Sequence, residues 1–228
     1  MSIKDNVKRV YENIYETALK TGRNPESITL VAVTKKRTIG EIQEAVDAGV
    51  TNFGENRVLE ASEKIPFVKG GLTWHLIGHL QSNKIKEAVK SFGWIESLDS
   101  FKLADLLSER AEAENKKVNV LIQVKISDED SKSGISADEA KNLILYSSAK
   151  KMLIVRGLMA IGTFGVSADY TRKEFAFING IFMRLKNDPE TSPFTEVLSM
   201  GMSGDYRTAV EEGSTMVRIG TAIFEKNY

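Results

Sequence analysis

Hydrophobic positions along the chain follow two different spacings. In residues 3–20, apolar side chains recur every three or four residues, which predicts an amphipathic helix. Beyond Gly22, short runs of apolar and β-branched residues alternate with further segments of helical spacing. The strand-like runs lie near 29–34, 51–53, 73–77, 94–97, 118–126, 154–161, 195–200 and 215–219. The helical segments between them lie near 39–48, 55–65, 82–90, 101–114, 137–149, 170–187 and 205–212.

Several predicted helices have recognisable ends. Residues 38–41 and 136–139 both have the Ser/Thr-x-x-Glu spacing of a capping box, in which two side chains satisfy the first backbone N–H groups of a helix. Gly49 and Gly213 follow helical segments, where a glycine commonly ends a helix.

Eight strand-like runs separated by helices predict an α/β protein, a single-domain (β/α)8 TIM barrel over residues 1–228, with residues 3–20 as an extra N-terminal helix. A doubly wound sheet is the alternative. That fold usually has fewer strands and a Gly-rich turn after the first one, where this chain has Lys35-Lys36-Arg37. In a barrel, the carboxyl ends of the strands meet on the face that holds the chemistry.

Composition excludes several classes of function. The 31 basic and 31 acidic residues give a formal net charge of zero, which does not favour binding to nucleic acid or to an anionic membrane. Absence of cysteine excludes disulfides and thiolate catalysis, and with only His75 and His79 no metal site is expected. The N-terminal segment lacks the apolar core of a signal sequence, and no run approaches the roughly 20 apolar residues of a spanning helix. We therefore expect a cytoplasmic protein.

The last two strands are followed by candidate anion-binding loops. Gly201, Ser203 and Gly204 follow the seventh strand, and Gly220 and Thr221 follow the eighth. Barrels commonly bind phosphate at these two loops, where glycines let the backbone N–H groups approach an anion closely. A loop whose glycines serve turn geometry alone is the alternative.

Lys35 stands at the end of the first strand. Most such lysines are solvated charges. Desolvation and the neighbouring cations Lys36 and Arg37 would instead favour a neutral amine, which condenses with an aldehyde to a Schiff base. An aldehyde that also has a phosphate group would account for both Lys35 and the two glycine-containing loops. Pyridoxal 5′-phosphate (PLP) is such a molecule.

Arg218 is a third candidate, on the eighth strand just before Gly220. An arginine is essentially always protonated, so facing the pyridine nitrogen it would keep that nitrogen unprotonated and make the ring a poor electron sink. A structural salt bridge with Glu55 or Glu96 is the alternative interpretation.

Six segments then identify a family resemblance. "LVAVTKK", "FGENRVLE", "WHLIGHLQSNK", "SKSGI", "RGLMAI" and "LSMGMSGDYRTAVEEGSTMVRIGTAIF" resemble, in order and spacing, the pyridoxal phosphate homeostasis protein family over about residues 5–225. The resemblance implies a barrel like the cofactor domain of alanine racemase, with one PLP per chain. It implies Lys35 as the Schiff-base lysine, Asn56 and the neighbourhood of His79 beside the ring, Ser203, Gly220 and Thr221 at the phosphate, and Arg218 at the pyridine nitrogen. Residues 34–38 depart from the family's usual Ser-Lys-Thr-Lys-Pro.

Three functions compete: a protein that holds and delivers PLP without strong catalysis, a PLP-dependent amino-acid racemase or decarboxylase, and a barrel that binds another phosphorylated metabolite. Racemases and decarboxylases of this fold add a β-rich domain after the barrel, and we expect none here because little sequence follows Phe224. They also need a second acid–base group, for which Tyr206 is the one candidate. We therefore expect a role in intracellular PLP homeostasis, with PLP-dependent apo-enzymes as candidate partners, a monomeric state, and Lys132 as a surface charge.

Overall fold

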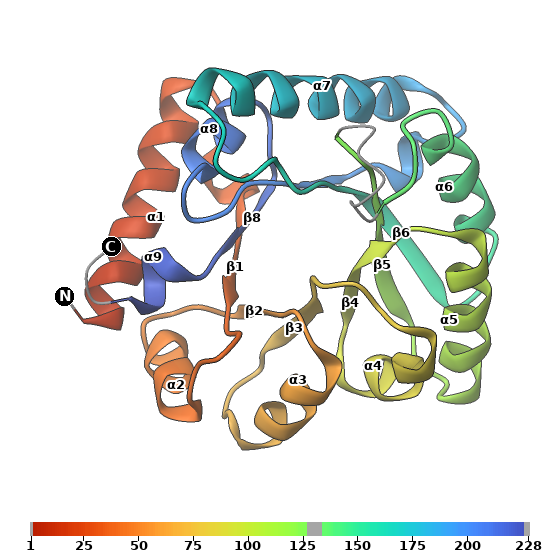
Figure 1. Cartoon of the computed structure of the whole chain (residues 1–228), viewed down its shortest axis with the longest axis horizontal. Coiled ribbons are helices and arrows are strands. Elements are labelled where there is room, and N and C mark those ends of the chain that lie inside the picture. Colours follow the sequence, from red (N-terminus) through yellow and green to blue (C-terminus); the bar gives the residue numbers. More distant parts are fainter. Residues whose placement is uncertain (1, 127–133, 226–228) are drawn as a thin grey trace.

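Eight parallel strands close into a barrel in which each strand pairs with its neighbour in the sequence and β8 pairs with β1 (Figure 1). This is a computed structural model, and it describes residues 2–126 and 134–225. The strands are β1 (Thr29–Val33), β2 (Asn52–Glu55), β3 (Thr73–Leu76), β4 (Trp94–Leu98), β5 (Val118–Gln123), β6 (Leu153–Met159), β7 (Val197–Ser199) and β8 (Met216–Ile219). The predicted (β/α)8 barrel is confirmed.

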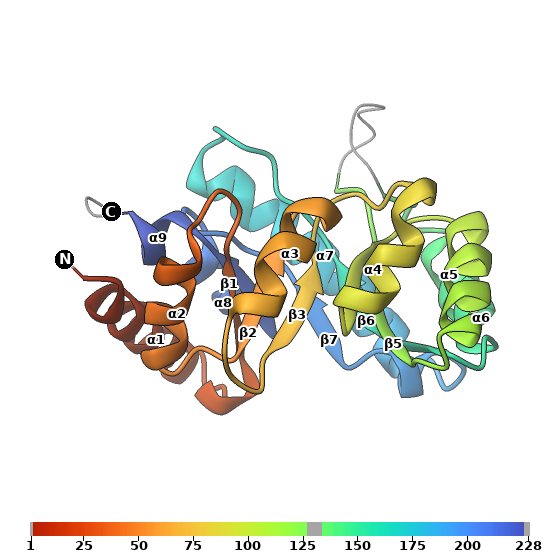
Figure 2. The same ribbon diagram turned by 90° about the horizontal axis from the view of Figure 1, so that it is seen from below.

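Helices surround the barrel. They are α1 (Ile3–Lys20), α2 (Ile39–Asp47), α3 (Val58–Lys64), α4 (Ile85–Ser91), α5 (Phe101–Ala113), α6 (Ala140–Ser148), α7 (Ala168–Asn187), α8 (Tyr206–Glu211) and α9 (Thr221–Phe224). Short 3₁₀ turns lie at Pro25–Ser27, Ile65–Phe67, Ser82–Lys84 and Ser192–Phe194. In Figure 2 the loops after β1 and β6 project from the same side of the barrel, as expected for strands that run in parallel. In the part of the chain that is described, every helix is too short or too polar to cross a bilayer.

The extra N-terminal helix is confirmed as α1, and it packs beside α8 and α9 (Figure 1). Ser2 and Asp5 form a capping box at its start. Val7, Val10 and Ile14 are buried on one face, as their spacing predicts.

One of the two predicted capping boxes forms. Thr38 and Glu41 cap α2 as expected. The prediction for residues 136–139 is wrong: Ser136 Oγ donates to Glu139 Oε2 at 2.6 Å, but residues 137–139 form a turn and α6 begins only at Ala140. The hydroxyl bonds the carboxylate, and no side chain caps α6. Gly49 and Gly213, each at φ 98°, follow α2 and α8 as predicted.

Other differences concern the ends of strands. The second strand extends to Glu55, so the helix expected from residue 55 begins at Val58. The fifth strand ends at Gln123 rather than near 126. Helix α9 was not expected, because residues 221–224 are mostly apolar and buried and resemble a continuation of the eighth strand.

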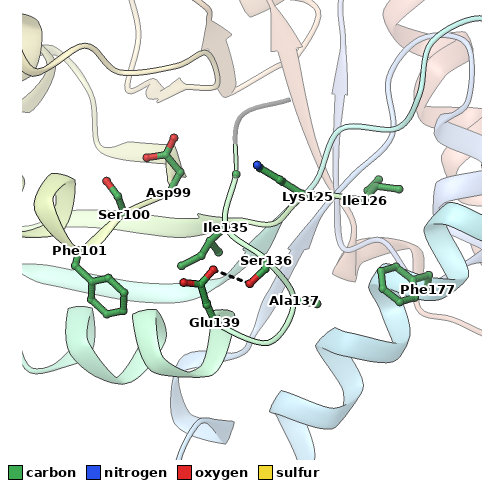
Figure 3. A pocket seen from close by; sticks show the side chains of 11 residues that line it. Asp99, Ser100, Phe101, Lys125, Ile126, Ile135, Ser136, Ala137, Glu139 and Phe177 are labelled. Carbon is green, nitrogen blue, oxygen red and sulfur yellow. Dashed lines mark hydrogen bonds between the residues drawn. The ribbon is translucent and has the colours of Figure 1, made fainter. Parts of the chain in front are cut away.

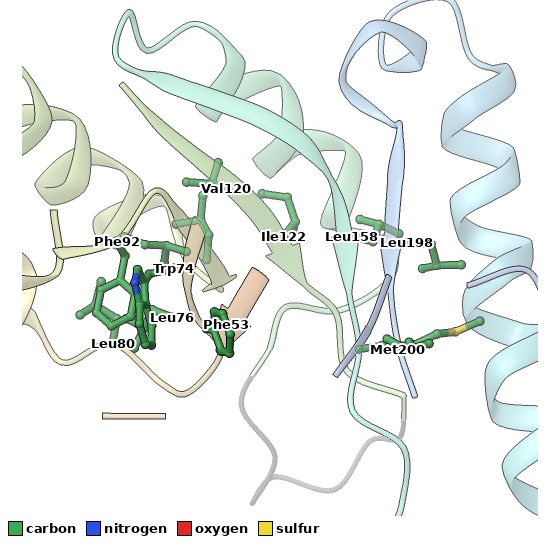
Figure 4. Close-up of a cluster of buried hydrophobic side chains, with 14 of the residues drawn as sticks. Phe53, Trp74, Leu76, Leu80, Phe92, Val120, Ile122, Leu158, Leu198 and Met200 are labelled. Carbon is green, nitrogen blue, oxygen red and sulfur yellow. The ribbon is translucent and has the colours of Figure 1, made fainter. Parts of the chain in front are cut away.

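The core lies mainly between the strands and the surrounding helices. Figure 4 shows part of it, where Phe53 of β2 lies against Trp74 of β3 with ring centroids 5.4 Å apart. Leu76 and Phe92 are fully buried in the same cluster. Along the strands, apolar residues such as Phe53 and Leu76, which face the helices, alternate with residues that face the barrel interior, where several buried polar side chains lie.

Candidate functional site

The end of β8 lies directly against the end of β1. Ala32 pairs with Ile219. Gly220, the residue after β8, lies so close to Val33 that an added Cβ would stand 3.3 Å from both the Cβ and the carbonyl oxygen of Val33. The close approach brings the segment after β1, which contains Lys35, beside the start of α9. The first and last predicted site segments therefore meet.

Ser203 joins the loop after β7 to the same place. Its Oγ accepts hydrogen bonds from the backbone N–H groups of Gly220 and Ala222, both at 3.2 Å. Gly201 has φ 96°, and an added Cβ would stand 2.4 Å from the Cβ of Ala209, so only glycine fits there. Predicted phosphate-site residues Ser203, Gly220 and Thr221 are thus held together, each half-buried.

Two arginines border this loop, Arg9 of α1 and Arg207 of α8. A cavity of about 450 Å³ between α1 and the loop after β7 is lined by Arg9 and Arg207 together with Ser203 and Gly204. Neither arginine was predicted as a site residue: Arg9 is far from the loop in the sequence, and Arg207 falls in a segment of helical spacing without a signal of its own. Their positive charge favours an anion at the loop.

Asp205 holds the loop after β7 from within. Its Oδ1 accepts a hydrogen bond from the Met202 backbone N–H at 2.5 Å. Burial raises the pKa of Asp205, while this hydrogen bond and the charge of Arg218 act in the opposite direction.

Lys35 occupies a tight turn and is exposed. The Arg37 N–H donates to the Thr34 carbonyl at 3.0 Å, and Lys36 has φ 59°. The desolvation of Lys35 that the sequence suggested is absent in this structure, because solvent reaches the side chain. Arg37 Nη2 lies 3.2 Å from Glu225 Oε1, and this carboxylate offsets the charge of Arg37.

Arg218 lies in the barrel interior with 3% of its surface exposed. Its Nη1 donates to Ser199 Oγ at 2.6 Å and its Nη2 donates to the Ala160 carbonyl at 2.9 Å. Ser199 Oγ donates in turn to Glu96 Oε2 at 2.6 Å, and that oxygen lies 3.9 Å from Arg218 Nη1. Of the two salt-bridge partners considered for Arg218, Glu96 is therefore the one nearby.

His75 extends this buried network. Its Nδ1 lies 2.8 Å from Glu96 Oε1, its Nε2 lies 3.3 Å from Asn52 Oδ1, and its ring stacks on Trp94. His75 lies within β3 and is buried.

The charges of this network oppose the effect of burial on its carboxylate. Burial alone would raise the pKa of Glu96. The hydrogen bond from His75 and the charges of His75 and Arg218 outweigh it and lower that pKa. Burial lowers the pKa of Arg218.

A second cavity, of about 340 Å³, lies at the mouth of the barrel. It is lined by Asn56, Ile77, Gly78, His79, Gln123, Val124, Lys125, Ile126 and Ile161. Its size lies within the range of about 300–1,000 Å³ that small-molecule pockets occupy. Asn56 and His79 both line this cavity, and His79 Nδ1 lies 3.6 Å from Asp99 Oδ2. A place for either residue beside a PLP ring stays a prediction.

A neighbouring cavity of about 580 Å³ shares Lys125 and Ile126 with the cavity just described. Figure 3 shows Lys125, Asp99 and Ser136 around it. Lys125 was not predicted as a site residue, because the fifth strand was expected to continue to about residue 126 and to include it. Lys132, expected to be a surface charge, lies outside the described residues.

Tyr206 was the candidate second acid–base group. Its hydroxyl accepts a hydrogen bond from Asn13 Nδ2 of α1 at 2.9 Å, and the residue is buried. The hydroxyl therefore faces α1.

The fold and these loops define a barrel of the alanine racemase N-terminal domain class, and the family model of that description matches residues 6–227. Relatives called pyridoxal phosphate homeostasis protein include one from Pasteurella multocida (strain Pm70), 43% identical over 98% of this chain and 97% of its own length. Another, from Escherichia coli (strain K12), is 41% identical over 97% of this chain and 95% of its own. The chain belongs to the pyridoxal phosphate homeostasis protein family.

Solved structures agree with this assignment. PipY of Synechococcus elongatus PCC7942, solved with PLP bound, is 37% identical, has a TM-score of 0.81, and is matched over 92% of this chain and 99% of that one. An unknown protein from Bifidobacterium adolescentis, also 37% identical, gives a TM-score of 0.90 over 97% of this chain and 94% of that one. Alanine racemase from Clostridium difficile 630 is 16% identical, with a TM-score of 0.73, and is matched over 96% of this chain and 56% of its own, which shows a shared fold alone.

Proposed function

We propose that this protein binds PLP as a Schiff base on Lys35 and acts in intracellular PLP homeostasis, holding and delivering the cofactor without strong catalysis. The observation that carries the proposal is the meeting of three strand ends. Gly220 lies against Val33, and Val33 stands two residues before Lys35 in the sequence. The Gly220 N–H donates a hydrogen bond to Ser203 Oγ. An amine and an anion-binding loop thus lie on neighbouring segments.

The residues present fit such a group. The Ser203 and Thr221 hydroxyls and the two arginines that line the adjoining cavity are donors suited to a phosphate. The Gly220 and Ala222 N–H groups donate to Ser203 Oγ and hold that side chain in the loop. Lys35 is open to solvent, so an aldehyde can reach its amine. PLP supplies that aldehyde and a conjugated ring.

Each predicted residue has a task in this proposal. Lys35 would hold the aldehyde of PLP: its amine, once unprotonated, would form a C=N bond in place of the aldehyde C=O bond, and the oxygen would leave as water. Ser203, Gly220 and Thr221 hold the phosphate, and Asn56 lies beside the ring. Arg218 faces the pyridine nitrogen and, because it has no acceptor, keeps that nitrogen unprotonated.

Holding the cofactor is favoured over racemisation by the position of Tyr206. A racemase needs an acid–base group on each face of the substrate's α-carbon, and the Tyr206 hydroxyl is bonded to Asn13 on the α1 side. A monomeric state, a cytoplasmic location and PLP-dependent apo-enzymes as partners belong to the same proposal.

The test is to incubate the protein with PLP, reduce it with borohydride, and map the labelled peptide. We expect a visible absorption band that borohydride removes, and a label on Lys35. Lys35→Ala should lose both, whereas Lys36→Ala, a change at the adjacent exposed lysine, should keep both.

Three outcomes would count against the proposal. A label on another lysine would contradict the role of Lys35. Rapid exchange of the α-proton of alanine, with D-alanine formed, would favour a racemase. Failure to form the band, together with tight binding of a sugar phosphate or nucleotide, would favour a barrel for another phosphorylated metabolite.

A further inference from the structure

The turn that contains Lys35 adopts a conformation that needs outside support. Lys36, the next residue, has φ 59°, a left-handed conformation that is unfavourable for any residue with a Cβ. The Lys36 backbone N–H donates to Glu60 Oε1 of α3 at 2.6 Å. Helix α3 therefore holds the turn on the C-terminal side of Lys35.

Lys64 holds the other side of the same turn. Its ammonium donates to the Thr34 carbonyl at 2.9 Å, to Glu55 Oε1 at 3.0 Å and to Glu60 Oε1 at 2.6 Å. Thr34 Oγ1 also donates to Glu55 Oε1, at 2.6 Å. Both neighbours of Lys35 are thus bound, Thr34 through its carbonyl and its hydroxyl and Lys36 through its N–H.

We propose that Lys64 and Glu60 are positioning residues for Lys35. They fix the turn so that its amine is presented to PLP, and this inference rests on the function proposed above. Neither residue is required to touch the cofactor. Because Glu60 Oε1 accepts from both Lys64 and Lys36, the ammonium also orients the carboxylate that holds the turn.

The charges around Lys64 explain why a lysine is needed there. Its side chain is 13% exposed and lies between two carboxylates. Burial raises the pKa of Glu55, whose Oε2 has no hydrogen-bond partner among the described residues. Burial also opposes ionisation of Glu60, but the hydrogen bonds from Lys64 and the Lys36 N–H outweigh it and lower the pKa of Glu60. Removing the ammonium would leave Glu55 and Glu60 without their shared cation.

The alternative is an ordinary ion pair that stabilises α3 and has no bearing on Lys35. The two interpretations differ in what happens to Lys36. A positioning role requires that loss of Glu60 frees the Lys36 amide and lowers the reactivity of Lys35.

The first measurement uses the protein without PLP and follows hydrogen exchange of the Lys36 amide by NMR. We expect Glu60→Ala to speed this exchange about tenfold, the size of effect that follows from losing one hydrogen bond. Glu60→Gln should restore much of the protection, because its amide oxygen can still accept from the Lys36 N–H. Glu63→Ala, a change of an exposed glutamate on the same helix, is the control.

The second measurement is the PLP concentration needed for half-maximal borohydride trapping at Lys35. Glu60→Ala and Lys64→Met should each raise it about tenfold. Lys141→Met is the matched control, because Lys141 also binds two carboxylates, Asp188 and Glu190, at 2.7 and 2.5 Å. Melting temperatures of all variants identify any that fail to fold.

The results separate this inference from the proposed function. If the wild-type protein is not trapped at Lys35, the proposed function fails, whatever the amide exchange shows. If the wild type is trapped and folded Glu60→Ala and Lys64→Met match it in exchange and in trapping, the positioning role is overturned. An equal loss of trapping in Lys141→Met would also overturn it, because the effect would then be general.

Discussion

A buried guanidinium such as that of Arg218 requires compensation, and the structure provides it within hydrogen-bonding reach. Ser199 bridges Arg218 to Glu96, and Glu96 also binds His75. Removing one member of a buried charged network is usually more costly than never building it, because the remaining charge is left unpaired in a poorly solvated place. Glu96 is therefore the residue on which the stability of this network depends most.

We expect Glu96→Gln to lower the free energy of unfolding by about 3–5 kcal/mol at neutral pH. Urea unfolding of the variant and the wild type measures this difference. The exposed Glu16→Gln is the control and should change little. A loss below about 1 kcal/mol would mean that Ser199 and Ala160 satisfy Arg218 without the carboxylate.

The lowered pKa of Glu96 predicts that the stability of the folded protein depends on pH. The pKa of Glu96 is lowered in the folded protein, so its contribution is fully present above the ordinary glutamate pKa of about 4.3 and is lost as the pH falls through the lowered value. The stability difference between wild type and Glu96→Gln should therefore narrow in acid below about pH 4.3. A difference that stays constant down to the lowest pH at which both remain folded would contradict the lowered pKa.

Lys35, at an abrupt strand end, and Arg218, before a glycine, could be singled out from the sequence as candidates, and their contacts with PLP stay predictions. Glu96 was one of two partners considered for Arg218, and it is the one that lies nearby. Ser199 and Arg9 could not be found, because a serine or an arginine acquires its contacts only when distant strands and helices meet. The contacts of His75 could not be found for a related reason: a strand pattern does not show which residue faces the barrel interior.

At the scale of elements, the loop after β2 and the end of β3 are packed without room for a side chain. A Cβ at Gly78 would stand 2.3 Å from the carbonyl oxygen of Asn56. Backbone atoms cannot move aside as a flexible side chain can, so the two segments keep a fixed separation. Asn56 and Gly78 line the same cavity, and this packing determines its shape.

Gly78→Ala should therefore lower stability by about 1–3 kcal/mol, the range for overpacking, and weaken PLP binding. Gly93→Ala is the matched control: Gly93 directly precedes β4, and an added Cβ there would meet nothing within 4 Å. Thermal unfolding of both variants measures the expected loss of stability, and titration with PLP measures the expected loss of affinity. Equal behaviour of the two alanine variants would contradict the role assigned to the packing of Gly78 against Asn56.

Most elements could be predicted, and their ends less well. Periodicity located the eight strands and the extra helix α1, because each buries one regular set of side chains. It failed at α9, where residues 221–224 fill the space beside Gly220 as a short helix although their composition suits a strand. The capping-box spacing failed at Ser136, whose hydroxyl donates to Glu139 in a turn before α6.

For the whole molecule, closure of the barrel brings the two ends of the sheet together, and the number of strands was enough to predict that closure. The candidate site lies on the seam between β1 and β8, with Lys35 following the first strand and Gly220 the last. A ligand bound to both would link segments that are about 185 residues apart in the sequence, the difference between positions 220 and 35. Its binding should therefore stabilise the seam more than the opposite side of the barrel.

PLP at about 100 times its dissociation constant should stabilise the folded protein by about 2.7 kcal/mol. For a chain of this size that corresponds to a rise in melting temperature of about 5–11 °C. Amide hydrogen exchange should slow most in β1 and β8, where the ligand would join the two strands, and less in β4 and β5. Lys35→Ala should keep part of the PLP-induced rise in melting temperature, because Ser203, Gly220 and Thr221 can still hold the phosphate. Inorganic phosphate added to the wild type should give a small rise in melting temperature without the same slowing of amide exchange in β1. Uniform protection across all strands, or no rise at saturating PLP, would contradict a ligand that spans the seam.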